Sequence, residues 1–307
     1  MISLKPVLKR GALVAAANWQ VTLVQATADS LFKLLIATPI LGGVFLVALV
    51  AGTEPGELMT LEWREMAATI VGSLRSHPLV LIAFLLAVGV VAVGGSLCVF
   101  LVKAGTVATL VRGERQAGNI EEPPLHLESL RQGAAFSAER YIDASRALFP
   151  RYARLGLILM VVYLASGAAY LAALFAIGLT GDTWGLAALV TVSFVIWITV
   201  VNWLYLLVQI VIAADDCSVA AASARVATFI RRERRAVGTV FLVILGLVVA
   251  ATGVSWLATA ALWLIGFVPF IGLALIPIQL MAWLFRGIVF QYLGLSSVGA
   301  YVRLYRE

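Results

Sequence analysis

The stretch "LAALVTVSFVIWITVVNWLYLLVQIVIA", residues 186–213, contains no charged residue. An α-helix rises about 1.5 Å per residue, so roughly 20 consecutive apolar residues are enough to cross the hydrocarbon core of a bilayer. This stretch is longer than that minimum, and its polar residues are few. It therefore predicts a helix that spans a membrane.

Five further runs share this character, and the composition agrees with them. The chain is 62% hydrophobic and 12% charged, whereas an ordinary soluble domain has about 25% charged residues. The last two spans are separated only by "GFVPF", which favours a tight turn at a membrane surface. We expect an all-α integral membrane protein with a single membrane domain over residues 1–307. The six predicted spans are 31–51, 79–101, 155–179, 186–213, 237–265 and 270–293.

Charge is concentrated between the spans. The segment "DDCSVAAASARVATFIRRERRAVG", residues 215–238, carries five arginines and three acids. Of the 22 lysines and arginines, 18 lie in the N-terminal arm with the start of the first span, in the loops after spans two and four, and in the tail, whereas only Arg64 and Arg75 lie on the other side. Cytoplasmic loops carry the excess of positive charge, so we expect both termini in the cytoplasm. A dedicated patch for nucleic acid or a phosphorylated ligand is the alternative interpretation of the arginine run.

The same segment predicts an amphipathic helix in the membrane interface. Asp216 or Ser218 can cap its start, and apolar residues recur on one side at helical spacing from Val219 to Ile230. We expect that side to lie in the acyl boundary and the opposite side to meet lipid headgroups. The basic side carries Arg225, Arg231, Arg232 and Arg235.

Similar segments precede the other pairs of spans. Residues 11–30 come before the first span, and residues 137–154 come before the third, where Pro150 is expected to break the helix. The chain therefore predicts three hairpins, each preceded by an interfacial amphipathic helix. The octapeptides "GTVATLVR" from Gly105 and "GAYVRLYR" from Gly299 share Gly, Leu and Arg at matched positions, which is a further sign of repetition.

The long outer loop, residues 53–78, has its own pattern. An apolar stripe runs beside several glutamates, which predicts a helix lying on the outer surface. A substrate lid is the alternative interpretation of this loop.

No set of residues for catalysis or metal binding converges in the sequence. His77 and His126 are expected on opposite sides of the membrane, and Cys98 and Cys217 at different depths. These placements argue against a Ser-His pair, a metal site and a disulfide. The sequence also lacks a phosphate-binding glycine loop and a dinucleotide fingerprint. We therefore expect no catalytic residue, no metal, no cofactor and no enzyme activity.

Polar residues within the spans form the remaining candidate site, which we call the polar seam. Residues seven apart share a helix face, and this spacing relates Asn202, Gln209 and Asp216 on the fourth span and Gln279 and Arg286 on the sixth. Interhelical hydrogen bonds and an arginine that reaches the interface would explain the seam structurally. A conduction or lipid-headgroup site is the alternative. Because a charge within a span is costly, we expect Arg286 to pair with Gln209 or Asp216, or with Asp215 in its place.

The charged segment after the fourth span and the terminal "YVRLYRE" resemble the glycerophosphoryl diester phosphodiesterase membrane-domain family and related bacterial six-helix proteins. The matched positions are Asp216, Ala221, Ser223 and Arg232. The resemblance implies a six-helix fold in a bacterial cytoplasmic membrane. Some members carry a soluble phosphodiesterase barrel after the membrane part, and that activity is not expected of this chain.

These observations lead to two functional hypotheses. The first is a non-enzymatic membrane module that binds lipid or a partner protein at the cytoplasmic face, with no role for nucleic acid. The second is a permease or channel subunit for a small or lipid-like substrate that follows the polar seam. A polar cavity between the fourth and sixth spans would favour the second, and a dry packed core the first.

Overall fold

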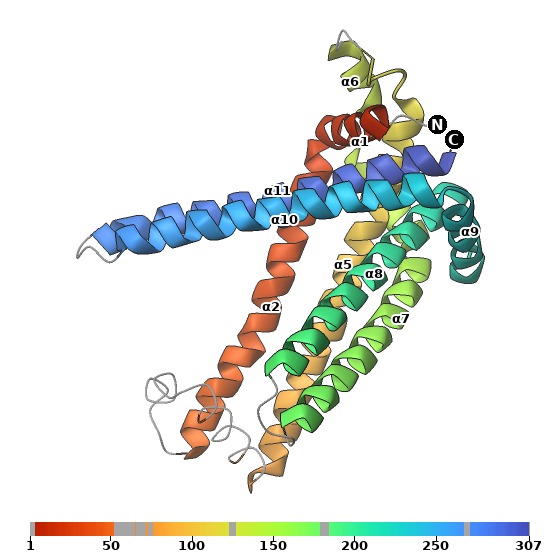
Figure 1. Ribbon diagram of the computed structural model, residues 1–307. Coiled ribbons are helices and arrows are strands. Elements are labelled where there is room, and N and C mark those ends of the chain that lie inside the picture. Colours follow the sequence, from red (N-terminus) through yellow and green to blue (C-terminus); the bar gives the residue numbers. More distant parts are fainter. Residues whose placement is uncertain are drawn as a thin grey trace. The chain divides into compact units, whose positions relative to one another are not determined.

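The computed structural model describes residues 4–51, 65, 72, 76–122, 127–178, 184–266 and 271–306. These residues form helices and short connections, and none of them lies in a strand (Figure 1). The predicted outer-loop helix falls outside the described residues apart from a few positions, and so do residues 267–270 of the predicted tight turn. The helices are α1 (Leu4–Ala17), α2 (Trp19–Ala51), α5 (Pro78–Gln116), α6 (Leu127–Gly133), α7 (Ala138–Gly178), α8 (Trp184–Asp215), α9 (Val219–Arg232), α10 (Arg234–Gly266) and α11 (Ile271–Arg306).

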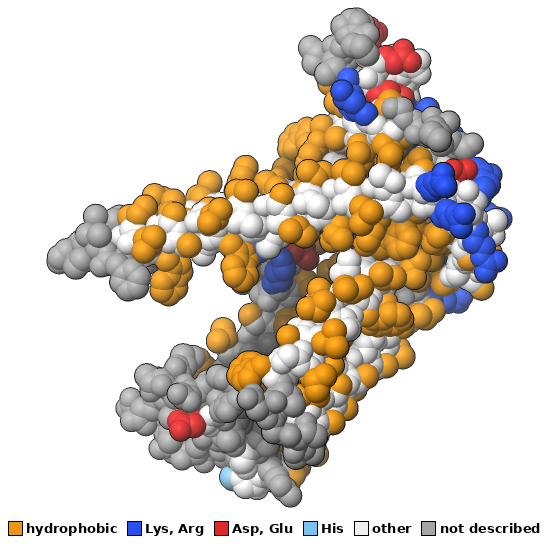
Figure 2. Space-filling view, viewed as in Figure 1, with side chains coloured by type: hydrophobic (Ala, Val, Ile, Leu, Met, Phe, Trp, Pro, Cys, Tyr) orange, Lys and Arg blue, Asp and Glu red, His pale blue; other side chains and the backbone are white. Residues whose placement is uncertain are grey.

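Six of these helices are long and apolar enough to cross a membrane, which confirms the all-helical fold class and the predicted number of spans. Large apolar side chains such as Leu164, Phe175 and Leu257 are more than 70% exposed along them. Figure 2 shows such side chains spread over the long helices. An apolar surface of this extent is unusual for a soluble monomer and suits contact with lipid. The candidate spans are Trp19–Gly43, Pro78–Gln116, Ala138–Gly178, Trp184–Asp215, Arg234–Ile265 and Pro277–Arg306.

The chain divides into two compact units, and Thr27–Val99 form the smaller one. Within it the ring of Phe32 covers Gly95 on α5, and the ring of Phe84 covers Gly43 on α2. A Cβ at Gly95 would lie 2.6 Å from Cδ2 of Phe32, so the glycine makes room for the ring. The later residue on α2, Gly43, contacts the earlier residue on α5, Phe84. The two helix segments therefore run antiparallel.

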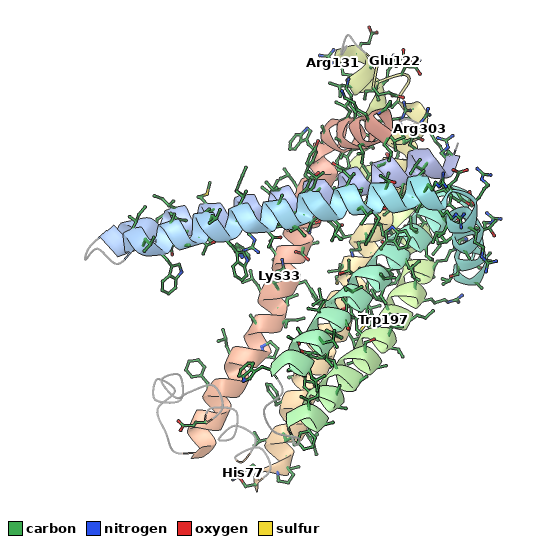
Figure 3. The ribbon with its side chains drawn as sticks, in the orientation of Figure 1. Lys33, His77, Glu122, Arg131, Trp197 and Arg303 are labelled. Carbon is green, nitrogen blue, oxygen red and sulfur yellow. The ribbon has the colours of Figure 1, made fainter. Side chains whose placement is uncertain are left out.

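The larger unit, Met1–Ala26 with Phe100–Glu307, contains the pair α7 and α8. Trp197, labelled in Figure 3, donates from its indole nitrogen to the hydroxyl of Ser166 at 2.9 Å. Nearer the other end of the pair, the Tyr152 hydroxyl donates to the backbone carbonyl of Gln209 at 2.8 Å. The later residue on α8, Gln209, contacts the earlier residue on α7, Tyr152. These two helices are therefore also antiparallel.

Helix α7 continues through Pro150, and the predicted break there is wrong. Proline removes one helical donor and costs about 3 kcal/mol in a helix interior. The neighbouring turns are held from both sides by other helices. Tyr141 donates to the carbonyl of Val102 on α5 at 2.7 Å, and Tyr152 is fully buried against α8. These tertiary contacts outweigh the local cost.

The predicted segment 11–30 is divided between two helices at Asn18. This side chain is fully buried and all of its hydrogen-bonding groups are used. Its amide nitrogen donates to the carbonyls of Val14 and Gly133, and its oxygen accepts from the backbone N–H groups of Ala135 and Phe136. Asn18 therefore ties the junction of α1 and α2 to the connection after α6.

Helix α9 begins where the sequence predicts. Of the two candidate caps, Ser218 is the one used, because its hydroxyl accepts from the N–H of Ala221 at 3.3 Å. Part of the apolar side that was expected to meet the acyl boundary is covered by protein. Ala222, Val226 and Phe229 are buried against the rest of the unit, and Phe229 meets the ring of Tyr305 edge to face.

The carboxyl ends of α5, α8 and α11 meet in the larger unit. The Arg115 guanidinium donates to the carbonyl of Ala214 at 2.6 Å, which joins α5 to α8. The Tyr305 hydroxyl donates to Asp215 at 2.6 Å, which joins α11 to α8. Arg306 donates to Glu114 at 2.6 Å, which joins α11 to α5. Three helices that are distant in the chain thus end at one place.

Helix α1 packs on the end of α11, backbone against backbone. A Cβ at Gly299 would lie 2.9 Å from Cα of Gly11, and one at Gly11 would lie 2.5 Å from the carbonyl oxygen of Ser296. Gly105, the counterpart of Gly299 in the paired octapeptides, makes a similar approach. A Cβ there would lie within 3 Å of Tyr141 on α7. The matched glycines therefore have matched roles as contact points for another helix.

Candidate functional site

The structure places the residues of the polar seam in three separate positions. Asn202 and Gln209 line a pocket that α8 and α11 share with other helices. Gln279 and Arg286 line a different groove between α10 and α11. Asp216 lies beyond the end of α8 with a φ of 49°, a left-handed conformation. Because the helix ends at Asp215, the seven-residue spacing no longer sets the direction of the Asp216 side chain.

The acids expected to pair with Arg286 make ion pairs with other arginines. Asp215 accepts from Arg225 at 2.5 Å and from Tyr305, and Asp216 pairs with Arg151. The Arg286 guanidinium lies 5.6 Å from the centre of the Phe290 ring. This contact is a cation–π interaction, which is attractive in an apolar setting.

The α8–α11 pocket, as we call the first of these sites, lies within the larger unit and has a volume of about 350 Å³. Small-molecule sites commonly measure about 300–1,000 Å³, so it is at the lower end of that range. The part of its lining that comes from α10 is wholly apolar, with Phe241, Ile244, Leu245 and Val248. Its polar wall comes from the four other helices, with Gln25, Lys103, Thr106, Thr199, Asn202, Trp203, Tyr205, Gln209, Gln291, Ser297 and Tyr301.

Lys103 is the cation of this pocket, and no Asp or Glu is among the residues that line it. The Lys103 ammonium lies 5.4 Å from the centre of the Tyr205 ring, so the ring places the charge beside α8. In the sequence, Lys103 is distinguished only by its place just after the second predicted span. The only local signal is a second polar residue, Thr106, one turn further along α5. Its hydrogen bond to Gln25 at 3.2 Å is visible only in the structure.

Two polar side chains in the pocket wall are buried without hydrogen-bond partners within the described part of the chain. They are the amide nitrogen of Gln209, whose residue is 2% exposed, and the hydroxyl of Tyr205 one turn earlier on α8. A buried polar group left unpaired costs about 1–3 kcal/mol. Almost all such groups in folded proteins are satisfied, so an unpaired donor in a pocket wall is a sign of something that binds there.

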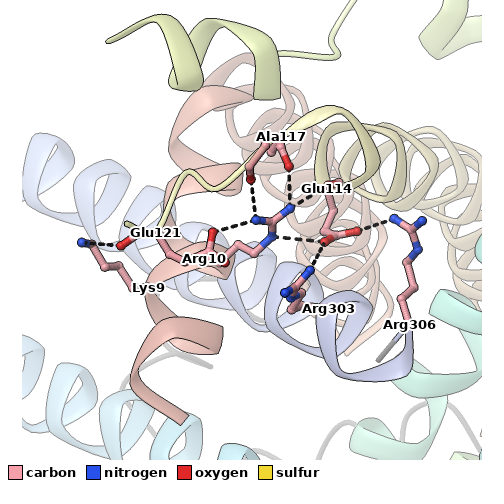
Figure 4. Close-up of polar contacts among 8 residues, drawn as sticks. Lys9, Arg10, Glu114, Ala117, Glu121, Arg303 and Arg306 are labelled. Atoms are coloured by element: carbon pink, nitrogen blue, oxygen red, sulfur yellow. Dashed lines mark hydrogen bonds and ion pairs between the residues drawn. The ribbon is translucent and has the colours of Figure 1, made fainter. Parts of the chain in front are cut away.

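A second polar region lies where α1, α5 and α11 meet (Figure 4). Arg10 is 4% exposed and Glu114 is 2% exposed. Arg10 pairs with Glu114 at 3.1 Å and with Glu121 at 2.6 Å. It also donates to the backbone carbonyls of Glu114 near the end of α5 and of Ala117 and Gly118 just after it. We call this region the Arg10–Glu114 cluster.

Arg306 and Arg303 complete that cluster from α11. Arg306 contacts the other oxygen of Glu114 at 2.6 Å, and Arg303 lies 4.0 Å from the same carboxylate. The sequence analysis treated Arg10 only as a topological charge. Nothing local to Arg10 reveals the pair, because Glu114 is more than 100 residues away in the chain.

The arginines of α9 form a third polar region. Arg231 and Arg232 at its end are exposed, and so is Arg235 in the first turn of α10, as predicted for the basic side of this segment. Figure 2 shows basic side chains gathered over α9 and the neighbouring helix ends. Arg225 differs, because its hydrogen bond to Asp215 and the charge of that carboxylate raise the pKa of its guanidinium.

No family model, no curated protein and no solved structure matches this chain.

The chemistry of these regions is therefore interpreted from their geometry. In the described part of the chain, no group of three or more His, Cys, Asp or Glu could hold a metal ion. His126 and the outer-loop residues Glu54, Glu57 and Glu62 fall outside that part. The α8–α11 pocket offers hydrogen-bond donors, one cation and an apolar wall. Such a set can hold a molecule that has an acceptor-rich end and an apolar end.

Proposed function

We propose that this chain is a non-enzymatic membrane module that binds anionic lipid at the cytoplasmic face of a bacterial membrane. The observation that carries the proposal is the arrangement of α9. Ala222, Val226 and Phe229 on its apolar side are buried in the protein. Arg231 and Arg232 at its end, and Arg235 in the first turn of α10, are exposed. A helix held in this way presents a fixed row of cations, each of which attracts an anionic surface by about 1 kcal/mol.

The proposed placement is six spans in three hairpins with both termini in the cytoplasm. It is supported by the distribution of basic residues, 18 of 22 of which fall on the proposed inner side. The meeting of the α5, α8 and α11 ends is consistent with it, because alternate spans of a multi-pass protein end on the same side of the bilayer. The resemblance to the glycerophosphoryl diester phosphodiesterase membrane-domain family, carried by Asp216, Ala221, Ser223 and Arg232, remains part of the proposal.

The placement can be tested with reporter fusions. A reporter that is active only in the periplasm should be silent when fused to the C-terminus and active when inserted at Gly56. The reverse pattern would contradict the proposed orientation and, with it, the role given to α9.

Lipid binding can be tested by native mass spectrometry of the full chain released from detergent with bound lipid. The wild type should retain phosphatidylglycerol in preference to phosphatidylcholine. Replacing Arg231, Arg232, Arg234 and Arg235 with glutamine should remove most of that preference. As a matched control, Arg286→Gln removes a cation from the α10–α11 groove and should leave the preference unchanged. Equal retention by the fourfold variant would contradict the proposal and favour a partner protein as the ligand of α9.

A permease or channel subunit for a small or lipid-like substrate is the second candidate. The α8–α11 pocket favours it, because polar residues there are set among helices that are otherwise apolar. Proteoliposomes that contain the purified chain should then move a fluorescent lipid between leaflets faster than protein-free vesicles. Equal rates in the two preparations would remove this candidate.

A further inference from the structure

The donors of the α8–α11 pocket point to the kind of group it accepts. Gln209 is 2% exposed, and its amide nitrogen has no partner within the described part of the chain. The backbone carbonyl of the same residue is occupied by Tyr152, so the main chain there is fixed. In the apolar part of a bilayer no bulk water is at hand to satisfy such a donor. The Tyr205 side chain interacts with that of Gln209 but does not satisfy its amide nitrogen. An acceptor on an occupant would satisfy it.

The charge of the pocket narrows the choice of acceptor. Lys103 lines the pocket, and Asp and Glu are missing from the lining residues. The nearest acid further along α8 is Asp215, which is held by Arg225 and Tyr305. An anion with several acceptor oxygens can meet the Lys103 ammonium and the Gln209 amide together. Hydrogen bonds to an ionised acceptor are roughly twice as strong as neutral ones.

The apolar lining from α10 indicates that this anion is joined to an apolar chain. Phe241 and Val248 of α10 form part of this lining, seven residues apart and therefore on one face. Asn202 lies at the exposed edge of the pocket, where its side-chain oxygen accepts from Tyr163. A pocket of about 350 Å³ holds a headgroup and the first part of a chain, but not a whole two-chain lipid.

We propose that the α8–α11 pocket binds the phosphate-bearing headgroup of an anionic lipid, with Lys103 and Gln209 on the phosphate and the acyl chain along Phe241 and Val248. This is a single saturable site, separate from the exposed arginines of α9. It rests on the proposed placement of the chain in a membrane, and it does not depend on lipid contact by α9.

Thermal unfolding of the delipidated full chain in detergent tests the site. Short-chain dioctanoyl phosphatidate should raise the midpoint in a saturable manner, as any ligand that binds only the folded state does. Dioctanoyl phosphatidylcholine and inorganic phosphate should each raise it far less. An equal shift with phosphatidylcholine would show that the anion is not recognised. An equal shift with inorganic phosphate would show that the site takes a free anion. Either result, or no shift with phosphatidate, would overturn the proposal.

Variants separate binding from folding. Gln209→Leu removes an unpartnered buried amide, so without lipid it should be as stable as the wild type or slightly more stable. Its affinity for dioctanoyl phosphatidate should nevertheless fall at least about tenfold, and the affinity of Lys103→Gln should fall by a similar factor. Wild-type affinity in both variants would contradict the site.

Two controls keep the site distinct from other cations. Arg286→Gln lies in the α10–α11 groove, and the fourfold glutamine variant of Arg231, Arg232, Arg234 and Arg235 alters α9. Both should keep the saturable response to phosphatidate. Loss of that response in the fourfold variant alone would assign the lipid to the exposed arginines and overturn the proposed site in the pocket. Loss of the response only in Gln209→Leu and Lys103→Gln would support the site in the pocket.

Discussion

The Arg10–Glu114 cluster and the α8–α11 pocket lie in the same unit and both bury polar groups, but they leave those groups in opposite states. Every donor of the Arg10 guanidinium is used, on Glu114, Glu121 and the end of α5. The amide nitrogen of Gln209 has no partner within the described residues. Buried charges persist only when they are paired, so the cluster is a structural connection. An unpaired donor on a pocket wall is instead available to a ligand.

The largest expected effect comes from breaking the cluster. Glu114→Gln would remove the buried carboxylate charge that Arg10 shares with Arg306, and would leave Arg10 with Glu121 alone. Removing one partner of a buried pair typically costs about 3–5 kcal/mol, and we expect a loss of that size in denaturant unfolding. Glu122→Gln, an exposed glutamate in the same connection, is the matched control and should change stability by less than about 0.5 kcal/mol. Similar results for the two variants would mean that the cluster does not stabilise the fold.

The glycine contact between α1 and α11 comes next. Gly11→Ala places a Cβ 2.5 Å from the Ser296 carbonyl and 2.6 Å from the Ala300 nitrogen, both of them backbone atoms. Overpacking of this kind costs about 1–3 kcal/mol, and the midpoint of thermal unfolding should fall accordingly. Gly253→Ala on α10 meets no atom within 4 Å and should be neutral or slightly stabilising. A stable Gly11→Ala protein would show that α1 does not pack on α11 in this way.

Two tyrosines on adjacent helices offer a finer comparison. The Tyr152 hydroxyl donates to Gln209, whereas the Tyr205 hydroxyl is unpartnered among the described residues. Tyr152→Phe should cost about 1 kcal/mol, because it removes a buried hydrogen bond between α7 and α8. Tyr205→Phe should cost nothing measurable in the lipid-free protein. Equal losses in chemical unfolding would indicate that Tyr205 has a structural partner and would weaken the contrast between cluster and pocket.

The smallest effect is expected on the exposed side of α9. Arg231→Gln alters a side chain in contact with solvent or headgroups, and exposed charges contribute at most about 1 kcal/mol. We expect stability in detergent to change by less than about 0.5 kcal/mol, while retention of phosphatidylglycerol falls. A larger loss of stability would place this arginine in the protein's own packing.

The sequence predicted the six long apolar helices and the separate helix α9, and it gave Ser218 as one of two candidate caps. These features depend on residues close together in the chain: the length of an apolar run, the 3.6-residue period and a hydroxyl three residues before an N–H. The same local logic misjudged Pro150, because the cost of proline is local whereas the contacts of Tyr141 and Tyr152 that offset it come from α5 and α8.

The candidate site could not be read from the chain, because its members come from five helices. Residues 202 and 209 were correctly placed on one face of α8, but the seven-residue rule failed at Asp216, where a left-handed residue follows the helix end. Lys103 and Gln25 line the pocket only because α5 and α2 pack against α8 and α11 in the folded chain.

Hydropathy and helical period are properties of a segment, and they decided that the chain is helical and suited to a membrane. The pairing of Arg10 with Glu114, the burial of the apolar side of α9 against protein and the unsatisfied amide of Gln209 were decided by the tertiary structure. The physical reason is that a charge or a hydrogen-bond donor is satisfied by whatever group comes within about 3 Å of it, and for these residues those groups belong to helices that only folding brings near.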